Sequence, residues 1–208
     1  MKTYSPIEER INVVSHAFGF IVSIVALIFL VVRAIQHGGA SYIVGFTIFG
    51  VSLILLYLAS TLYHRSTDPA VRSHLKVFDH SAIYILIAGT YTPFTLITIP
   101  GTTGWVIFGI SWGAALTGII LKLFFTGRFN IVSTVMYVVM GWVIVFAIKP
   151  LINNLPHEGI VWLFAGGIAY TVGAILYSIK YIKFNHAIFH ILVLAGSLCH
   201  FIAVYYYV

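Results

Sequence analysis

Charged residues divide this chain into long uncharged stretches. A helix needs about 20 apolar residues to cross the hydrocarbon core of a bilayer, and seven stretches approach that length. They predict transmembrane helices at about residues 14–32, 42–63, 79–99, 104–122, 131–148, 160–179 and 186–207. Pro100–Gly104, which has the composition of a tight loop, separates the third span from the fourth. We therefore expect an all-α, polytopic membrane protein in which residues 1–208 form a single seven-helix transmembrane domain.

Composition supports the membrane-protein class and limits the kinds of molecule that the protein is expected to contact. Hydrophobic residues make up 61% of the 208 residues and charged residues 8%, which excludes an ordinary water-soluble domain. The net charge is +6, but the basic residues are spread singly between apolar runs. We therefore expect anionic lipid headgroups, and no nucleic acid, as the counterpart of this charge. The single Cys199 excludes an internal disulfide.

Basic residues are distributed unequally between the two ends of the predicted helices. Loops on the cytoplasmic side of a membrane carry an excess of Lys and Arg. One end carries nine of the 11 basic residues, namely Lys2, Arg10, Arg65, Arg72, Lys76, Lys122, Arg128, Lys180 and Lys183. The other end carries only Arg33 and Lys149. This asymmetry predicts a cytoplasmic N-terminus and an extracytoplasmic C-terminus.

Polar residues gather at the cytoplasmic ends of four predicted helices. Polar groups are expensive to keep in hydrocarbon, so a set that converges at one depth is typical of a functional site. His80 is rotated by about 100° from Asp79 on a helix, and we leave it out of the site. His200 lies about 15 Å deeper than His190 and is expected to donate an interhelical hydrogen bond instead. The converging residues are Asn12 and His16, Ser60 and His64, Asp79, and His186 and His190.

These residues favour metal chemistry. His186 and His190 lie on one face of a helix, about 6 Å apart along its axis, and His64 would be the third ligand. Three imidazole nitrogens with an open fourth position are typical of a catalytic zinc site. Asp79 is the one carboxylate at this depth and would act as the general base. Ser60 would orient the water or a ligand histidine.

Each of these residues also has a structural interpretation when it is taken alone. Histidines at helix ends often bind lipid headgroups or loop carbonyls. Asp79 can cap the third helix or pair with Lys76, and Ser60 can bond a main-chain carbonyl. The set as a whole favours the metal site over these separate explanations.

Several spaced motifs occur together in an order that resembles a known family. They are Glu9-x-x-Asn12-x-x-x-His16, Ser60-x-x-x-His64, Phe78-Asp79, Gly89-Thr90-Tyr91-Thr92-Pro93, and His186-x-x-x-His190 with His200. Over nearly the whole chain they resemble the bacterial hemolysin III branch of the progestin and adipoQ receptor family. The wider superfamily includes alkaline ceramidases and adipokine receptors credited with ceramidase-like activity.

The resemblance implies a multi-pass protein of the bacterial cell membrane that binds Zn²⁺ near the cytoplasmic face. By this resemblance His64, His186 and His190 bind zinc, and Asp79 and Ser60 are catalytic residues near the metal-bound water. The implied activity is hydrolysis of a lipid amide, with membrane lipids as partners, in membrane lipid or fluidity homeostasis.

Two alternatives stay open. One is a pore-forming cytolysin, although the chain shows no amphipathic segment suited to insertion and no polar stripe suited to line a wide channel. The other is a sensor or receptor of the membrane in which zinc is structural and no turnover occurs.

Overall fold

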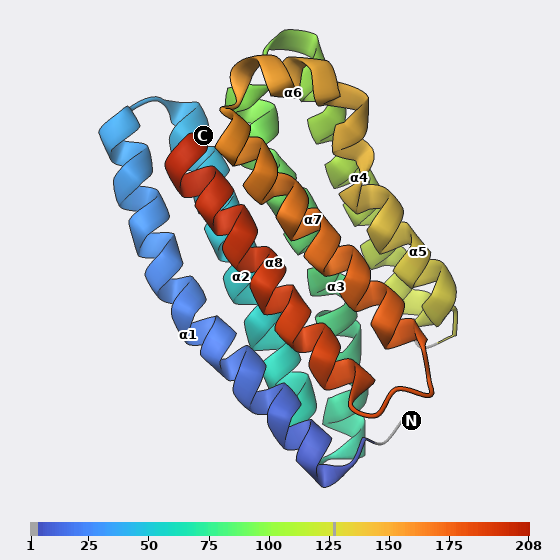
Figure 1. The fold of residues 1–208 in the computed structure, drawn as a ribbon. Coiled ribbons are helices and arrows are strands. Elements are labelled where there is room, and N and C mark those ends of the chain that lie inside the picture. The colour runs from blue at the N-terminus through green and yellow to red at the C-terminus, as the bar shows by residue number, and fades with distance from the viewer. Residues whose placement is uncertain (1–3, 127) are drawn as a thin grey trace.

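The structure of the protein is a computed structural model that describes residues 4–126 and 128–208. All regular secondary structure in these residues is helical, and seven helices are long and apolar enough to cross a membrane. The predicted all-α, seven-helix class is therefore confirmed. The two ends of the chain lie at opposite ends of the bundle, as an odd number of crossings requires (Figure 1). The cytoplasmic placement of the N-terminus stays a prediction from the charge asymmetry.

Each crossing begins before the apolar stretch that predicted it. The third helix begins at Pro69, well before Asp79, because the Asp68 carboxylate caps it by accepting two main-chain N–H hydrogen bonds. The first four crossings are α1 (Pro6–His37), α2 (Ala40–Arg65), α3 (Pro69–Pro93) with the π-helical turn η1 (Phe94–Thr98), and α4 (Gly101–Phe125). The last three are α5 (Asn130–Gly141) with the 3₁₀ segment η2 (Val143–Ala147) and α6 (Ile148–Asn154), then α7 (His157–Ser178), then α8 (Asn185–Tyr207).

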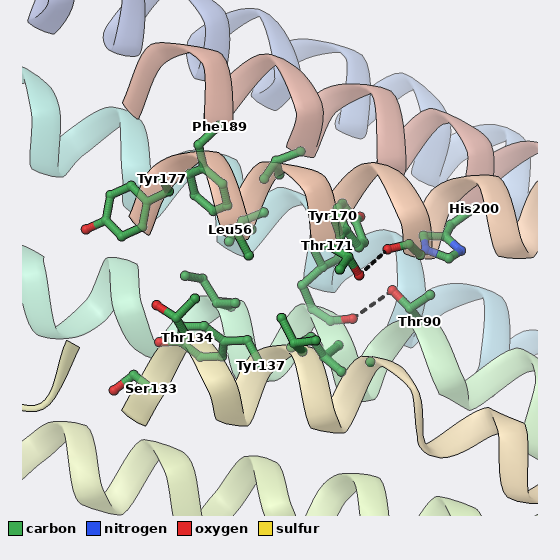
Figure 2. A pocket seen from close by; sticks show the side chains of 18 of the residues that line it. Leu56, Thr90, Ser133, Thr134, Tyr137, Tyr170, Thr171, Tyr177, Phe189 and His200 are labelled. Carbon is green, nitrogen blue, oxygen red and sulfur yellow. Dashed lines mark hydrogen bonds between the residues drawn. The ribbon is translucent and has the colours of Figure 1, made fainter. Parts of the chain in front are cut away.

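The crossings close into a ring. α2 packs between α1 and α3, α5 contacts α3, α4 and α7, and α8 packs against both α7 and α1. Figure 1 shows α8, in red, and α1, in blue, along the same side of the bundle, although they come from opposite ends of the sequence. The ring encloses a cavity of about 160 Å³, which runs along the bundle from the level of Tyr177 to that of His200 (Figure 2).

α1 presents one face to the bundle and another to lipid. Large side chains such as those of Ile7, Val14 and Phe18 are exposed on the outer face. The buried residues recur every three or four positions, which is the spacing of one helix face. They are Glu8, Asn12, His16, Gly19, Ser23, Ala26, Leu30 and Ala34. Because the most polar of them come first, α1 brings these groups to the end of the bundle that holds the N-terminus.

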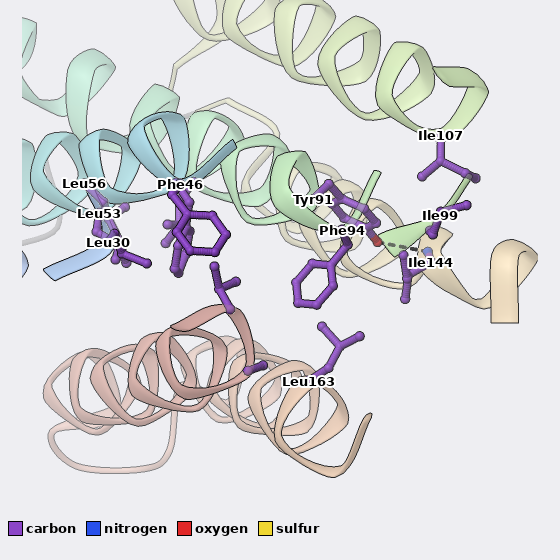
Figure 3. Close-up of a cluster of buried hydrophobic side chains, with 14 of the residues drawn as sticks. Leu30, Phe46, Leu53, Leu56, Tyr91, Phe94, Ile99, Ile107, Ile144 and Leu163 are labelled. Carbon is purple, nitrogen blue, oxygen red and sulfur yellow. Dashed lines mark hydrogen bonds between the residues drawn. The ribbon is translucent and has the colours of Figure 1, made fainter. Parts of the chain in front are cut away.

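Large apolar side chains fill the half of the bundle that holds the C-terminus. Leu30, Phe46, Leu53 and Phe94 are buried in one cluster that joins α1, α2 and η1, and Leu163 of α7 packs into the same cluster (Figure 3). In lipid such contacts stabilise through close packing, because the surrounding hydrocarbon is as apolar as the core. The buried carboxylates of Glu8 and Asp79 and the histidines His16, His64, His186 and His190 lie toward the opposite end of the bundle.

The fifth crossing is interrupted, although the sequence predicted a single span at 131–148. α5 ends at Gly141, and a 3₁₀ segment follows before α6. The Tyr91 hydroxyl lies 2.8 Å from the main-chain carbonyl oxygens of Met140 and Gly141, to which it donates. It also accepts the Ile144 N–H at 3.0 Å (Figure 3). Main-chain groups released from a helix inside hydrocarbon need such a partner, and Tyr91 supplies it from α3.

Replacement of Tyr91 by phenylalanine tests this account of the break. Tyr91→Phe removes one hydroxyl, so the carbonyl oxygens of Met140 and Gly141 and the N–H of Ile144 lose their hydrogen bonds to it. We expect the free energy of unfolding to fall by about 1–3 kcal/mol, seen as a lower midpoint of thermal unfolding in detergent. Tyr206→Phe, at an exposed tyrosine, is the matched control. Equal midpoints for the two variants would contradict the role of the Tyr91 hydroxyl.

Candidate metal centre

Three histidine side chains converge at the end of the bundle that holds the N-terminus. His64 lies in the last turn of α2, and His186 and His190 lie in the first turns of α8. The Nε2 atom of His186 is 3.0 Å from that of His64 and 2.9 Å from that of His190. All three side chains are buried, and one ligand atom from each lies within 4.8 Å of the others. Nitrogens around a tetrahedral zinc ion are about 3.4 Å apart, so this cluster is able to hold a metal ion.

The start of α8 is fixed from two sides. Phe184, directly before the helix, has a left-handed backbone with φ 58° and ψ 26°, a conformation that costs a non-glycine residue about 1–2 kcal/mol. The Asn185 side chain donates to the carbonyl oxygen of Tyr177 at 2.8 Å and so ties α8 to the end of α7. The main-chain N–H of His186 donates to the Glu8 carboxylate of α1 at 3.4 Å. These contacts determine the depth at which the two α8 imidazoles enter the cluster.

Glu9 orients His64 from α1. Its carboxylate accepts a hydrogen bond from Nδ1 of His64 at 2.6 Å and also pairs with the Arg72 guanidinium. With the proton on Nδ1, Nε2 of His64 carries a lone pair directed at the cluster. A carboxylate behind a ligand histidine is the usual arrangement at metal sites, where it fixes the tautomer and strengthens the ligand. Glu9 thereby joins α1, α2 and α3 at the candidate centre.

Tyr4 lies directly before α1 and covers the cluster. Its ring centroid is 4.7 Å from that of His186, and its hydroxyl is 3.2 Å from Nδ1 of His186. Burial raises the pKa of the Tyr4 hydroxyl well above its usual value, so the group stays protonated and neutral at physiological pH. The Tyr4 hydroxyl can form a hydrogen bond with Nδ1 of His186, and Nε2 of the same ring faces the cluster.

Two further polar side chains of α1 lie beside the cluster. The His16 ring stacks on the His190 ring, with centroids 3.5 Å apart and planes inclined by 9°. Asn12 is buried, and neither polar atom of its side chain has a hydrogen-bond partner among the described residues. Buried amides are normally satisfied, so Asn12 is suited to bind a polar ligand at the centre. The histidines that could hold a metal do not include His16.

Asp79 and Ser60 lie where the cluster meets the cavity. The Asp79 carboxylate is beside the Ser60 hydroxyl and close enough to His64 to interact with its charge. Both residues line the cavity together with His186 and His190. Asp79 is outside the group of candidate metal ligands, which leaves its carboxylate available to accept a proton. The catalytic roles of Asp79 and Ser60 stay predictions.

Two other histidines, His80 and His200, lie beside the cavity. His80 lines the same cavity as Asp79, because the cavity wall spans more than one face of α3. Nδ1 of His200 has no hydrogen-bond partner among the described residues, so the expected interhelical bond is not formed from this nitrogen. The His200 ring packs against Tyr170 and over Gly166, where a Cβ atom would lie 2.6 Å from Nε2. The missing side chain of Gly166 therefore makes room for this ring at the cavity wall.

Sequence reasoning missed the partners that surround the ligand histidines. Tyr4 carries no signal, because it precedes the first apolar run. Glu9 belongs to a motif, but its spacing gives no indication that His64 and Arg72 are its partners. The available signal was the position of Glu9 at the edge of an apolar stretch, since a carboxylate near hydrocarbon needs a cation or a donor.

The fold and the cluster together define a polytopic helical membrane protein with a candidate metal centre at one end of the bundle. The family described as "Haemolysin-III related" matches residues 4–201. "Hemolysin-3" of Bacillus cereus is 52% identical over 201 residues, which cover 97% of this chain and 92% of that protein. The "Hemolysin-3 homolog" of Bacillus subtilis (strain 168) is 50% identical over 200 residues, which cover 96% and 94%. The chain therefore belongs to the Haemolysin-III related family.

The chain is also similar to a more distant protein. The human "Monocyte to macrophage differentiation factor" is 26% identical over 168 residues, which cover 77% of this chain and 68% of that protein. No solved structure gives a significant match. The resemblance to hemolysin III inferred from spaced motifs is confirmed. Seven apolar helices and the two Bacillus relatives also support the expected location, a multi-pass protein of a bacterial membrane.

Replacement of Glu9 tests its role in joining three helices. Glu9→Gln leaves the Arg72 cation unpaired and weakens the bond to His64. We expect the free energy of unfolding to fall by about 1–3 kcal/mol, measured as the thermal midpoint in detergent without added metal. Glu158→Gln, at an exposed carboxylate of the other bundle end, is the control. A Glu9→Gln midpoint as high as that of the control would show that this carboxylate does not hold the helices together.

Proposed function

We propose that His64, His186 and His190 hold a zinc ion and that the protein is a zinc-dependent hydrolase of lipid amides. The observation that carries the proposal is the convergence of three buried Nε2 atoms beside a carboxylate, at the end of a membrane-embedded cavity. Imidazoles suit zinc, and three protein ligands with an open fourth position are typical of catalytic sites. The Glu9 carboxylate behind His64 and the unsatisfied Asn12 amide also fit such a centre.

The residues around the cluster have complementary tasks in such a reaction. A zinc ion bound here would supply Lewis-acid activation of water and of an amide carbonyl. Asp79 would accept the proton of the attacking water and return it to the leaving nitrogen. Ser60, beside Asp79, would hold that carboxylate in position by donating its hydroxyl hydrogen. His16, stacked on His190, would limit the rotation of that ring.

The cavity supports a lipid as the substrate. It begins at the cluster and continues along the bundle between α3, α5, α7 and α8 with a mostly apolar lining, including Leu56, Ile83, Leu86 and Phe164 (Figure 2). An acyl chain in this space would place its polar end at the histidines. Such a lining suits a hydrocarbon chain better than a water-filled pore, which favours the hydrolase over a cytolysin.

Metal content tests the first half of the proposal. Purified protein is expected to contain roughly one zinc ion per chain, measured by X-ray fluorescence. His190→Ala removes one of three ligands and is expected to lose the metal while the helix content stays unchanged. His157→Ala, at an exposed histidine of the opposite end, should keep it. Wild-type protein that is folded but free of metal in zinc-replete medium would exclude the zinc proposal.

Asp79 separates a hydrolase from a sensor with structural zinc. Asp79→Asn keeps the size of the side chain but removes the proton acceptor, so release of fatty acid from lipid amides should fall about 10²- to 10⁴-fold while zinc content stays the same. Asp68→Asn, at a helix cap outside the site, controls for loss of a carboxylate. Zinc-loaded wild-type protein without turnover on lipid amides would favour the sensor.

A further inference from the structure

Lys122 is a buried cation for which the chain offers no acidic partner. It lies near the end of α4 with only 4% of its surface exposed. The chain has five acidic residues, all within the described part, and the two ion pairs found among the described residues both involve Glu9. Lysine is almost never fully buried unless it is paired, and an ionisable group within a membrane helix is typical of a functional site. An anion from outside the protein is therefore suited to supply the counter-charge.

The ammonium group of Lys122 is held at the cavity instead of turning outward. Its Nζ donates to the hydroxyl of Ser133 on α5 at 2.5 Å, and that hydroxyl donates in turn to the Phe129 carbonyl oxygen at 3.0 Å. A lysine near a helix end usually extends its charge into the headgroup region. Here the charge is bound between two helices. An ammonium group has three donors, and Ser133 takes one of them.

Lys122 and Ser133 line two hollows at once. Both residues line the main cavity together with His80 and Tyr137, and both also line a second hollow between α4 and α5. Leu121, Phe129 and Val132 border this second hollow and are exposed on the lipid-facing side. The Lys122 cation thus lies between the main cavity and a lipid-facing hollow, at the end of the bundle where the ligand histidines also lie.

We propose that Lys122 and Ser133 form a binding site for the anionic headgroup of a single-chain amphiphile whose hydrocarbon chain occupies the main cavity. A carboxylate or phosphate oxygen supplies the missing counter-charge, and the ammonium and an anion form a charge-assisted hydrogen bond. The apolar lining of the cavity accommodates the chain. The site requires only the cation and the cavity, so it is independent of metal binding and of turnover.

The test compares three amphiphiles with the same chain length: oleate, oleoyl lysophosphatidate and the uncharged oleyl alcohol. Affinity is measured in neutral detergent by quenching of tryptophan fluorescence with the brominated forms, since Trp142 lines the cavity. We expect wild-type protein to bind at least one of the two anions about tenfold or more tightly than the alcohol. The anion that binds more tightly identifies the headgroup chemistry. Equal affinities for all three would overturn the proposal.

Variants locate the effect at Lys122. Lys122→Met should remove the preference for the anion and leave the affinity for the alcohol unchanged, which also reports that the cavity is intact. Lys122→Arg keeps the charge and should keep most of the preference. Arg128→Met, at an exposed basic residue in the same region, should change nothing. Preference for the anion that survives in Lys122→Met, or that is lost in Arg128→Met, would show that the general positive charge of the surface is responsible.

Discussion

The hydrocarbon core of the bilayer holds no water that could bind polar groups. This constraint determines how the main chain and the charged side chains of the protein are paired. Every main-chain N–H and carbonyl within hydrocarbon needs a partner from the protein, which is why the described residues are helical nearly throughout. Where a helix is interrupted, at Gly141, a side chain from another helix has to replace the lost bonds, and Tyr91 does so. The same constraint acts on charged side chains. Glu9 takes two partners, one on α2 and one on α3.

The candidate centre depends on these polar contacts between helices. The ligand histidines come from α2 and α8, but the groups that orient them come from α1, through Glu9, the ring of His16 and the carboxylate of Glu8. α1 is at the same time the helix with the most lipid-facing surface of those that touch the cluster. The first half of its inner stripe therefore supports the histidines, whereas the second half, with Leu30 and Ala34, joins the apolar core.

The sequence was sufficient for the overall architecture and for the residues that could bind a metal. Charges such as Arg33, Arg65 and Lys149 delimit the crossings clearly, and the spacing of His186 and His190 follows directly from the helical repeat. Contacts between distant segments could not be predicted from the sequence, because helical periodicity shows which face of a helix is buried but not which other helix covers it. The pairing of Glu9 with Arg72 and the interruption after Gly141 are of this kind. So is the burial of Lys122, which the charge count placed simply among the cytoplasmic basic residues.

The position of Tyr4 separates two routes to the histidines. Its ring closes the cluster on the side of the N-terminus, while the cavity reaches the same imidazoles from within the bundle. An ion that approaches from the side of Tyr4 would have to pass its ring, which lies against His186. A molecule within the cavity reaches the imidazoles of His186 and His190 without passing Tyr4. The proposed metal and the proposed lipid would then approach the histidines from different sides, with the Tyr4 ring in the way of the metal alone.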